Sequence, residues 1–273
     1  MPNQKTLYVS DLDETLLRSD ERLSDFTVQA LNALIERGMI FSYATARSYQ
    51  TASEVTRGLS ARLPTIVYNG TFILENGTQK KLLSNHFSKA ESSKILSVLK
   101  ENGLSPMVRA FVDDKERVAY CDARIGEGTK KYLARRVGDK RLFPVQAEAE
   151  LSTGEIFCIT CMDNADGQAI AYEALKEDFR CLSFTDVYTG AHWLEIQPKA
   201  ATKANAIQAL KEILGCDRVV CFGNGINDVC MFEIADECYA VGNAEDELKK
   251  IATAVIDTND HDGVAKWLLE HFE

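Results

Sequence analysis

The amino-acid sequence predicts an α/β fold in which a parallel sheet is interrupted by a second domain of mixed α+β character. Apolar runs alternate with helical patterns from residue 6 to residue 70, and the alternation breaks off near residue 83. It resumes with the apolar run at 218–223. Strands that alternate with helices form a doubly wound parallel sheet. We therefore predict a Rossmann-like core from residues 1–84 and 191–273, and an inserted α+β domain at 85–190.

The first part of the core follows from apolar periodicity. A buried strand is expected at 6–10, and Ser24 is suited to cap the next helix, which Gly38 ends. Further strands are expected at 39–44 and 64–68, with a helix between them. This β-α-β-α-β order predicts that all three strands join one parallel sheet.

The inserted domain has a different order of elements, in which expected helices and strands do not alternate regularly. Helices are expected at 88–102, 125–137 and 165–176, and strands at 107–112, 117–121, 155–162, 179–184 and 193–196. The core then returns with a helix at 204–214, a strand at 218–223 and a C-terminal helix at 264–272. Hinges between the domains are expected near 82–86 and 190–198.

Composition narrows the class of partner. The 273 residues are 45% hydrophobic and carry a formal net charge of −10. This argues against nucleic acid, whose phosphates need clustered Lys and Arg, but a small phosphorylated substrate needs only a few cations. No window approaches the roughly 18 apolar residues of a membrane span, and the N-terminus does not read as a leader. We expect a cytoplasmic protein with no membrane or nucleic-acid partner; its oligomeric state is left open.

The eight cysteines are expected to be reduced, structural thiols, because most lie in apolar surroundings and no secretion signal is seen. Cys158 and Cys161 have the spacing of a redox or zinc pair. They lie inside a predicted strand, however, and no second pair accompanies them.

Two carboxylates, Asp11 and Asp13, follow directly after the first strand. The carboxyl edge of an open α/β sheet is where ligands bind. Two like charges side by side there require a cation or a proton to offset their repulsion. The pair therefore indicates a divalent metal site, or a nucleophile beside an acid/base, and both fit phosphoryl transfer through an aspartyl-phosphate.

Three further segments lie where a phosphate site requires them. Thr45 and Ala46 end the second strand, where a hydroxyl and a backbone N–H can hold a phosphate oxygen. Lys203 opens a helix, an unfavourable place for a cation that indicates an anionic partner. After the strand at 218–223, glycines allow a sharp turn, and the side chains of Asn224, Asn227 and Asp228 offer oxygen ligands for Mg²⁺.

These four segments, in this order, resemble the motifs of the haloacid dehalogenase superfamily, Cof-type subfamily, which carries a large α/β cap domain. The resemblance covers essentially the whole chain. It implies a Mg²⁺-dependent phosphatase in which Asp11 is the nucleophile and Asp13 the general acid/base. It also implies phosphate binding by Thr45, Ala46, Lys203 and Asn227, and metal binding by Asp11, Asp13, Asn224 and Asp228.

Two positions depart from the family pattern. Glu14 stands where the family usually has glycine, and Asn224 stands where it usually has a metal-binding aspartate. An amide oxygen can still bind Mg²⁺ but supplies one negative charge fewer. We therefore expect weaker metal binding than is usual in the family, partly recovered by Asp228.

The expected substrate is a small phosphorylated metabolite, such as a sugar phosphate. Two alternatives remain: a phosphosugar mutase of the same superfamily, and a catalytically weakened sensor of a phosphorylated ligand.

The inserted domain should act as a lid that contacts the rest of the substrate. Polar and aromatic candidates there are Arg109, Tyr120, His192 and Glu195.

Overall fold

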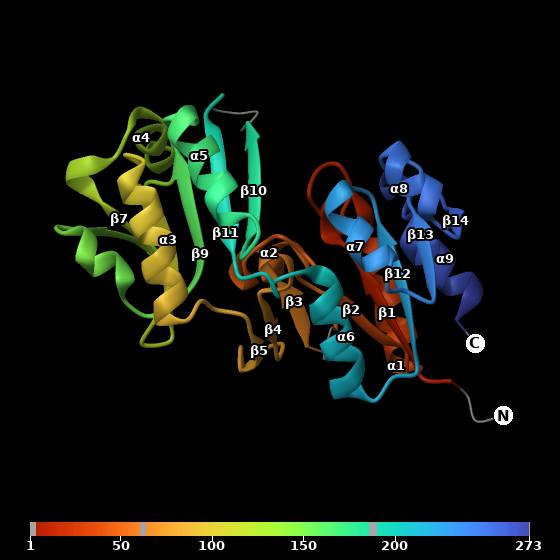
Figure 1. The fold of residues 1–273 in the computed structure, drawn as a ribbon. Coiled ribbons are helices and arrows are strands. Elements are labelled where there is room, and N and C mark those ends of the chain that lie inside the picture. The colour runs from red at the N-terminus through yellow and green to blue at the C-terminus, as the bar shows by residue number, and fades with distance from the viewer. Residues whose placement is uncertain (1–3, 61–63, 186–189, 273) are drawn as a thin grey trace. The chain divides into compact units, whose positions relative to one another are not determined.

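The computed structural model describes residues 4–60, 64–185 and 190–272. The chain divides into two compact units, one formed by Met1–Ser84 with Ala201–Glu273 and the other by Asn85–Ala200 (Figure 1). The second boundary lies ten residues later than the sequence predicts, because residues 192–197 form a strand of the inserted unit. For the same reason the hinge predicted at 190–198 is wrong over most of its length.

The core unit is built on a five-stranded parallel sheet in the order β14-β13-β12-β1-β2. This confirms the predicted α/β fold class. The strands are β1 (Thr6–Ser10), β2 (Ile40–Tyr43), β12 (Arg218–Gly223), β13 (Glu237–Ala240) and β14 (Ala254–Val255).

The two central strands, β1 and β12, determine where the site lies. Their apolar side chains are buried, as expected for parallel strands covered on both faces. The pairing runs in register to the end of β1, where Ser10 lies opposite Phe222. The segments that follow β1 and β12 therefore leave the sheet side by side.

Helices of the core connect these strands. They are α1 (Asp25–Glu36), α2 (Tyr49–Val55), α6 (Lys203–Leu214), α7 (Val229–Phe232), α8 (Asp246–Ile251) and α9 (Gly263–His271). The Ser24 side chain caps α1 by accepting the backbone N–H of Thr27 at 2.9 Å, as the sequence predicts. The helix α6 begins at Lys203 and is capped by Thr202.

The strand predicted at 64–68 does not extend the parallel sheet as expected. Its central part, β3 (Thr65–Val67), joins the core sheet only through one parallel bridge between Ala44 and Ile66. Instead it pairs antiparallel with β4 (Phe72–Leu74), which pairs with β5 (Lys81–Ser84). A tight turn at Tyr68–Gly70, where all three residues have positive φ, reverses the chain and makes this hairpin possible.

The inserted unit contains a six-stranded sheet in the order β10-β11-β9-β6-β7-β8, in which only the β7–β8 pair is parallel. Its strands are β6 (Pro106–Val112), β7 (Lys115–Cys121), β8 (Leu142–Val145), β9 (Glu155–Met162), β10 (Arg180–Thr185) and β11 (His192–Gln197). The edge strand β8 has no counterpart in the prediction, because it is short and contains Pro144.

Three helices pack on this sheet: α3 (Lys89–Glu101), α4 (Glu127–Ala134) and α5 (Ala165–Leu175). Apolar residues of α3 and α5, such as Ile95 and Leu175, form one core with Ile159 and Ile196 of the sheet. Tyr132 of α4 belongs to a second cluster with Met107, Val118 and Met162. The unit therefore has hydrophobic clusters of its own.

All eight cysteines are free thiols. Cys158 and Cys161 are buried in β9, as the strand prediction requires. Burial raises the pKa of Cys158 to about 12, so this thiol stays protonated and unreactive near neutral pH. Within the described residues, no helix is long and apolar enough to cross a membrane.

Gly70 is required where the turn after β3 meets the start of α6. Its φ is +93°, and a Cβ at this position would lie 2.0 Å from the carbonyl oxygen of Thr202. Gly77 has a similar φ of +89°, but nothing lies within 4 Å of the corresponding Cβ position. Comparing alanine substitutions at these two glycines therefore distinguishes the cost of backbone strain from the cost of steric overlap.

We predict that Gly70→Ala lowers the free energy of unfolding clearly more than Gly77→Ala. Both variants carry the strain of a left-handed alanine, about 1–2 kcal/mol, and only Gly70→Ala adds an overpacking cost of about 1–3 kcal/mol. Urea denaturation of the two variants and wild type measures the difference. Equal losses would show that α6 does not depend on this contact.

Candidate active site

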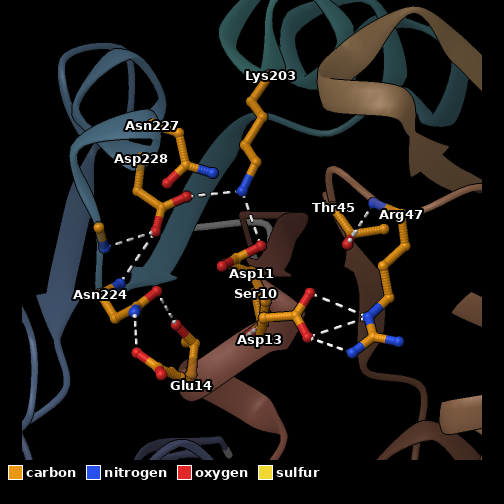
Figure 2. A network of polar contacts seen from close by, with 12 residues as sticks. Ser10, Asp11, Asp13, Glu14, Thr45, Arg47, Lys203, Asn224, Asn227 and Asp228 are labelled. Atoms are coloured by element: carbon orange, nitrogen blue, oxygen red, sulfur yellow. Dashed lines mark hydrogen bonds and ion pairs between the residues drawn. The ribbon is translucent and has the colours of Figure 1, made fainter. Parts of the chain in front are cut away.

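The site is centred on the side chain of Lys203, the first residue of α6. Its Nζ donates to Oδ1 of Asp11 at 2.7 Å and to Oδ1 of Asp228 at 2.7 Å (Figure 2). Asp11 directly follows β1, and Asp228 lies in the turn after β12. All three side chains are buried, with exposed fractions of 1% for Lys203, 6% for Asp11 and 0% for Asp228. The structure thus brings together three of the predicted residues from three distant segments.

Two carboxylates share one ammonium group, so their mutual repulsion is only partly compensated. Burial and the charge of Asp228 raise the pKa of Asp11 to about 7, although Lys203 acts in the opposite direction. Burial lowers the pKa of Lys203, but the charges of Asp11 and Asp228 outweigh it, and the net shift is upward. Lys203 is therefore charged at neutral pH, and Asp11 is poised near the point of ionisation.

Asp228 also organises the backbone that follows β12. Its Oδ2 accepts the N–H groups of Asn224 at 3.0 Å and Gly225 at 3.1 Å. A Cβ on Gly223 would lie 2.8 Å from the Asp228 side chain, so glycine is needed there. Both oxygens of Asp228 are thus engaged in holding Lys203 and this loop.

The carboxylate of Asp13 is directed away from Asp11 and toward Arg47 (Figure 2). Nε of Arg47 donates to both carboxylate oxygens at 3.0 Å, and Nη2 donates to Oδ1 at 2.5 Å. The same Nη2 reaches Glu21 at 2.8 Å. Sequence reasoning did not predict Arg47 as a site residue; its place two residues after Thr45, at the end of β2, was the available signal.

The predicted phosphate-binding residues have different environments. Thr45 is fully buried, and its Oγ1 accepts the backbone N–H of Arg47 at 3.1 Å. Ala46 is exposed beside it, and Asn227 is exposed next to Asp228. The contacts described for Lys203 Nζ are to the two carboxylates and do not include Asn227.

Asn224 directly follows β12, and its side chain is held by its neighbours. Its Oδ1 accepts the hydroxyl of Thr15 at 3.0 Å, and its Nδ2 lies 3.4 Å from Oε2 of Glu14. Neither Thr15 nor Glu14 was predicted as a site residue. In the part of the chain that the structure describes, no three His, Cys, Asp or Glu side chains are arranged as a metal cluster.

Comparison with known proteins agrees with this arrangement. The sequence pattern of the haloacid dehalogenase-like hydrolases matches residues 8–268. A Haemophilus influenzae protein provisionally named a phosphatase is 29% identical over 96% of this chain and 97% of its own length. The Bacillus subtilis 5-amino-6-(5-phospho-D-ribitylamino)uracil phosphatase YitU is 25% identical over 100% of this chain and 99% of its own. A solved structure from Thermotoga maritima has a TM-score of 0.79 at 23% identity, covering 98% of this chain and 97% of that one.

The chain therefore belongs to the haloacid dehalogenase-like hydrolase family. Its parallel core with an inserted sheet domain is of the Cof type expected from the sequence. It is an enzyme, and the family together with the names of its relatives supports hydrolysis of phosphoric monoesters as the class of reaction.

The raised pKa of Asp11 predicts a pH-dependent stability. Between its ordinary value of 3.8 and its folded value of about 7, the folded state binds more protons than the unfolded state. The free energy of unfolding therefore falls as the pH rises through this window, by at most about 4 kcal/mol. Asp11→Asn lacks this titration. In EDTA, the stability of wild type relative to Asp11→Asn should be greater at pH 5 than at pH 8, as measured by urea denaturation. A constant difference would contradict the shift.

Proposed function

We propose that this protein is a Mg²⁺-dependent phosphatase that hydrolyses a small phosphorylated metabolite through an aspartyl-phosphate on Asp11. One observation carries the proposal: a buried carboxylate at the end of β1 is fixed by a buried Lys203, with a second carboxylate, Asp13, two residues further along. A fixed, partly desolvated carboxylate is suited to nucleophilic attack. A neighbouring, half-exposed carboxylate is suited to proton transfer.

In the first half of the reaction, the Asp11 carboxylate attacks phosphorus in line with the leaving group. A P–O bond to Asp11 forms while the bond to the substrate oxygen breaks, and Asp13 gives its proton to that oxygen. In the second half, Asp13 takes a proton from water, and the water oxygen displaces Asp11 from phosphorus. Phosphate leaves and Asp11 regains its carboxylate.

The remaining residues balance charge during these steps. The Lys203 ammonium, the Thr45 hydroxyl and the backbone at Ala46 are proposed to hold phosphoryl oxygens, with Asn227 at the exposed side. Arg47 binds both carboxylate oxygens of Asp13 and is proposed to orient this group for proton transfer.

The oxygen atoms around Asp11 fit a hard divalent cation. We propose that Mg²⁺ is held by the Asp11 carboxylate, the Oδ1 of Asn224 and the backbone carbonyl of Asp13. Asp228 could join them only by releasing part of its contact with Lys203 or with the loop. When bound, Mg²⁺ would neutralise charge on the transferred phosphoryl group.

The proposed substrate class is a phosphate monoester of a sugar or sugar-like metabolite. Two Bacillus subtilis relatives, 25% and 26% identical to this chain, are named phosphatases of 5-amino-6-(5-phospho-D-ribitylamino)uracil. These names support a substrate whose phosphate is carried on a polyol chain. The proposed cytoplasmic location rests on the sequence alone.

We predict that Asp11→Asn abolishes phosphate release from p-nitrophenyl phosphate and from sugar phosphates in the presence of Mg²⁺, by at least about 10³-fold. An amide cannot form the phosphoenzyme. Circular dichroism should show an unchanged fold, and Asp20→Asn, which removes an exposed carboxylate, should retain activity. Activity of Asp11→Asn near the wild-type level would refute the nucleophile. Isomerised sugar phosphate without free phosphate would indicate a mutase, and no turnover by wild type would indicate a sensor.

A second prediction concerns Arg47. If Arg47 acts by positioning Asp13 for proton transfer, Arg47→Gln should lower kcat by about 10²-fold on an alkyl phosphate, whose leaving group needs a proton. The loss should be smaller on p-nitrophenyl phosphate, whose leaving group does not. Arg57→Gln, an exposed arginine just beyond α2, is the matched control. Equal losses on both substrates would mean that Arg47 acts otherwise than through Asp13.

A further inference from the structure

Glu14 has a backbone conformation that a glutamate rarely adopts. Its φ is +53° and its ψ is 15°, in the left-handed region that glycine enters without steric cost. Residues held in such a conformation concentrate at functional sites, where surrounding contacts maintain them. The positive φ of Glu14 therefore points to a functional role for its side chain.

The surroundings of Glu14 fix its backbone. Its carbonyl oxygen accepts Nδ2 of Asn243 at 2.8 Å, and Oδ1 of Asn243 accepts the backbone N–H of Asn259 at 3.0 Å. The segment is thus tied to the two loops that follow β13 and β14. This anchoring determines the direction in which the Glu14 side chain leaves the chain.

The Glu14 side chain extends toward Asn224, which is 210 residues away in the sequence (Figure 2). Oε2 of Glu14 lies 3.4 Å from Nδ2 of Asn224, while the Thr15 hydroxyl donates to Oδ1 on the other side of the same amide. The two contacts give the amide one orientation. The two positions at which this chain departs from the family motif are therefore neighbours in space.

Few of the charged groups near Asn224 remain available to attract a cation. Asn224 is neutral, and both oxygens of Asp228 are engaged by Lys203 and by backbone N–H groups. The carboxylate of Asp13 is paired with Arg47. Glu14 brings a carboxylate against Asn224, at the side chain that would otherwise contribute no charge. Its second oxygen, Oε1, has no hydrogen bond among those described for this residue.

We propose that Glu14 supplies the negative charge that Asn224 lacks, and holds the Asn224 amide in place, so that the site keeps its affinity for a divalent cation. The charge of the usual aspartate would then be supplied from the neighbouring loop. This inference rests on the proposed Mg²⁺-dependent function.

Calorimetric titration of the whole protein with Mg²⁺ tests this inference without measuring activity. Glu14→Gln should raise the Kd for Mg²⁺ about tenfold, since removing one nearby negative charge weakens the binding of a cation by about that order. Glu36→Gln removes an exposed carboxylate at the end of α1 and should leave the Kd unchanged. Asn224→Asp should lower the Kd, and the double variant Glu14→Gly with Asn224→Asp should bind Mg²⁺ about as tightly as wild type.

Thermal unfolding in EDTA separates this effect from misfolding. Glu14→Gly relieves the positive φ and should be at least as stable as wild type, yet bind Mg²⁺ more weakly. A wild-type Kd in Glu14→Gln, or an equal loss in Glu36→Gln, would overturn the role of Glu14 and leave the proposed function standing. No Mg²⁺ binding by wild type would overturn this inference together with the metal in the proposed function.

Discussion

The site depends on one electrostatic constraint: two buried carboxylates, Asp11 and Asp228, are held together by one buried ammonium group, that of Lys203. Removing one partner from such a cluster leaves an uncompensated buried charge, which typically costs about 3–5 kcal/mol. The constraint links the end of β1, the start of α6 and the turn after β12. It also leaves Asp11 with a raised pKa, because burial and the charge of Asp228 disfavour its ionised form.

Close backbone approach makes this cluster possible. Gly70 allows the turn after β3 to contact the residues that begin α6, and Gly223 leaves room for the Asp228 side chain. These glycines lie at the edges of elements and not within them, so they affect where elements meet more than whether they form. The position of Lys203 thus depends on residues that carry no charge.

The site places one of its negative charges at a different position from the one that the family motif leads one to expect. Asp13 is paired with Arg47, Asp228 with Lys203, and the neutral Asn224 with Glu14. Each of these three side chains has a defined partner. The motif positions alone would suggest a shortage of negative charge at Asn224, whereas the network brings one to it from residue 14.

The sequence by itself determined the parallel core, most helices of both units and the candidate residues, because apolar periodicity and strand-end motifs are local signals. It did not determine that β3 would turn back into a hairpin, or that the inserted unit would extend to residue 200, because strand partners are chosen by long-range contacts. The partners of Asp13 and Asn224 were decided only by the tertiary structure. In the sequence, Glu14 is only a departure from the family motif and Arg47 only the residue two positions after Thr45. Their importance follows from where folding places their charges.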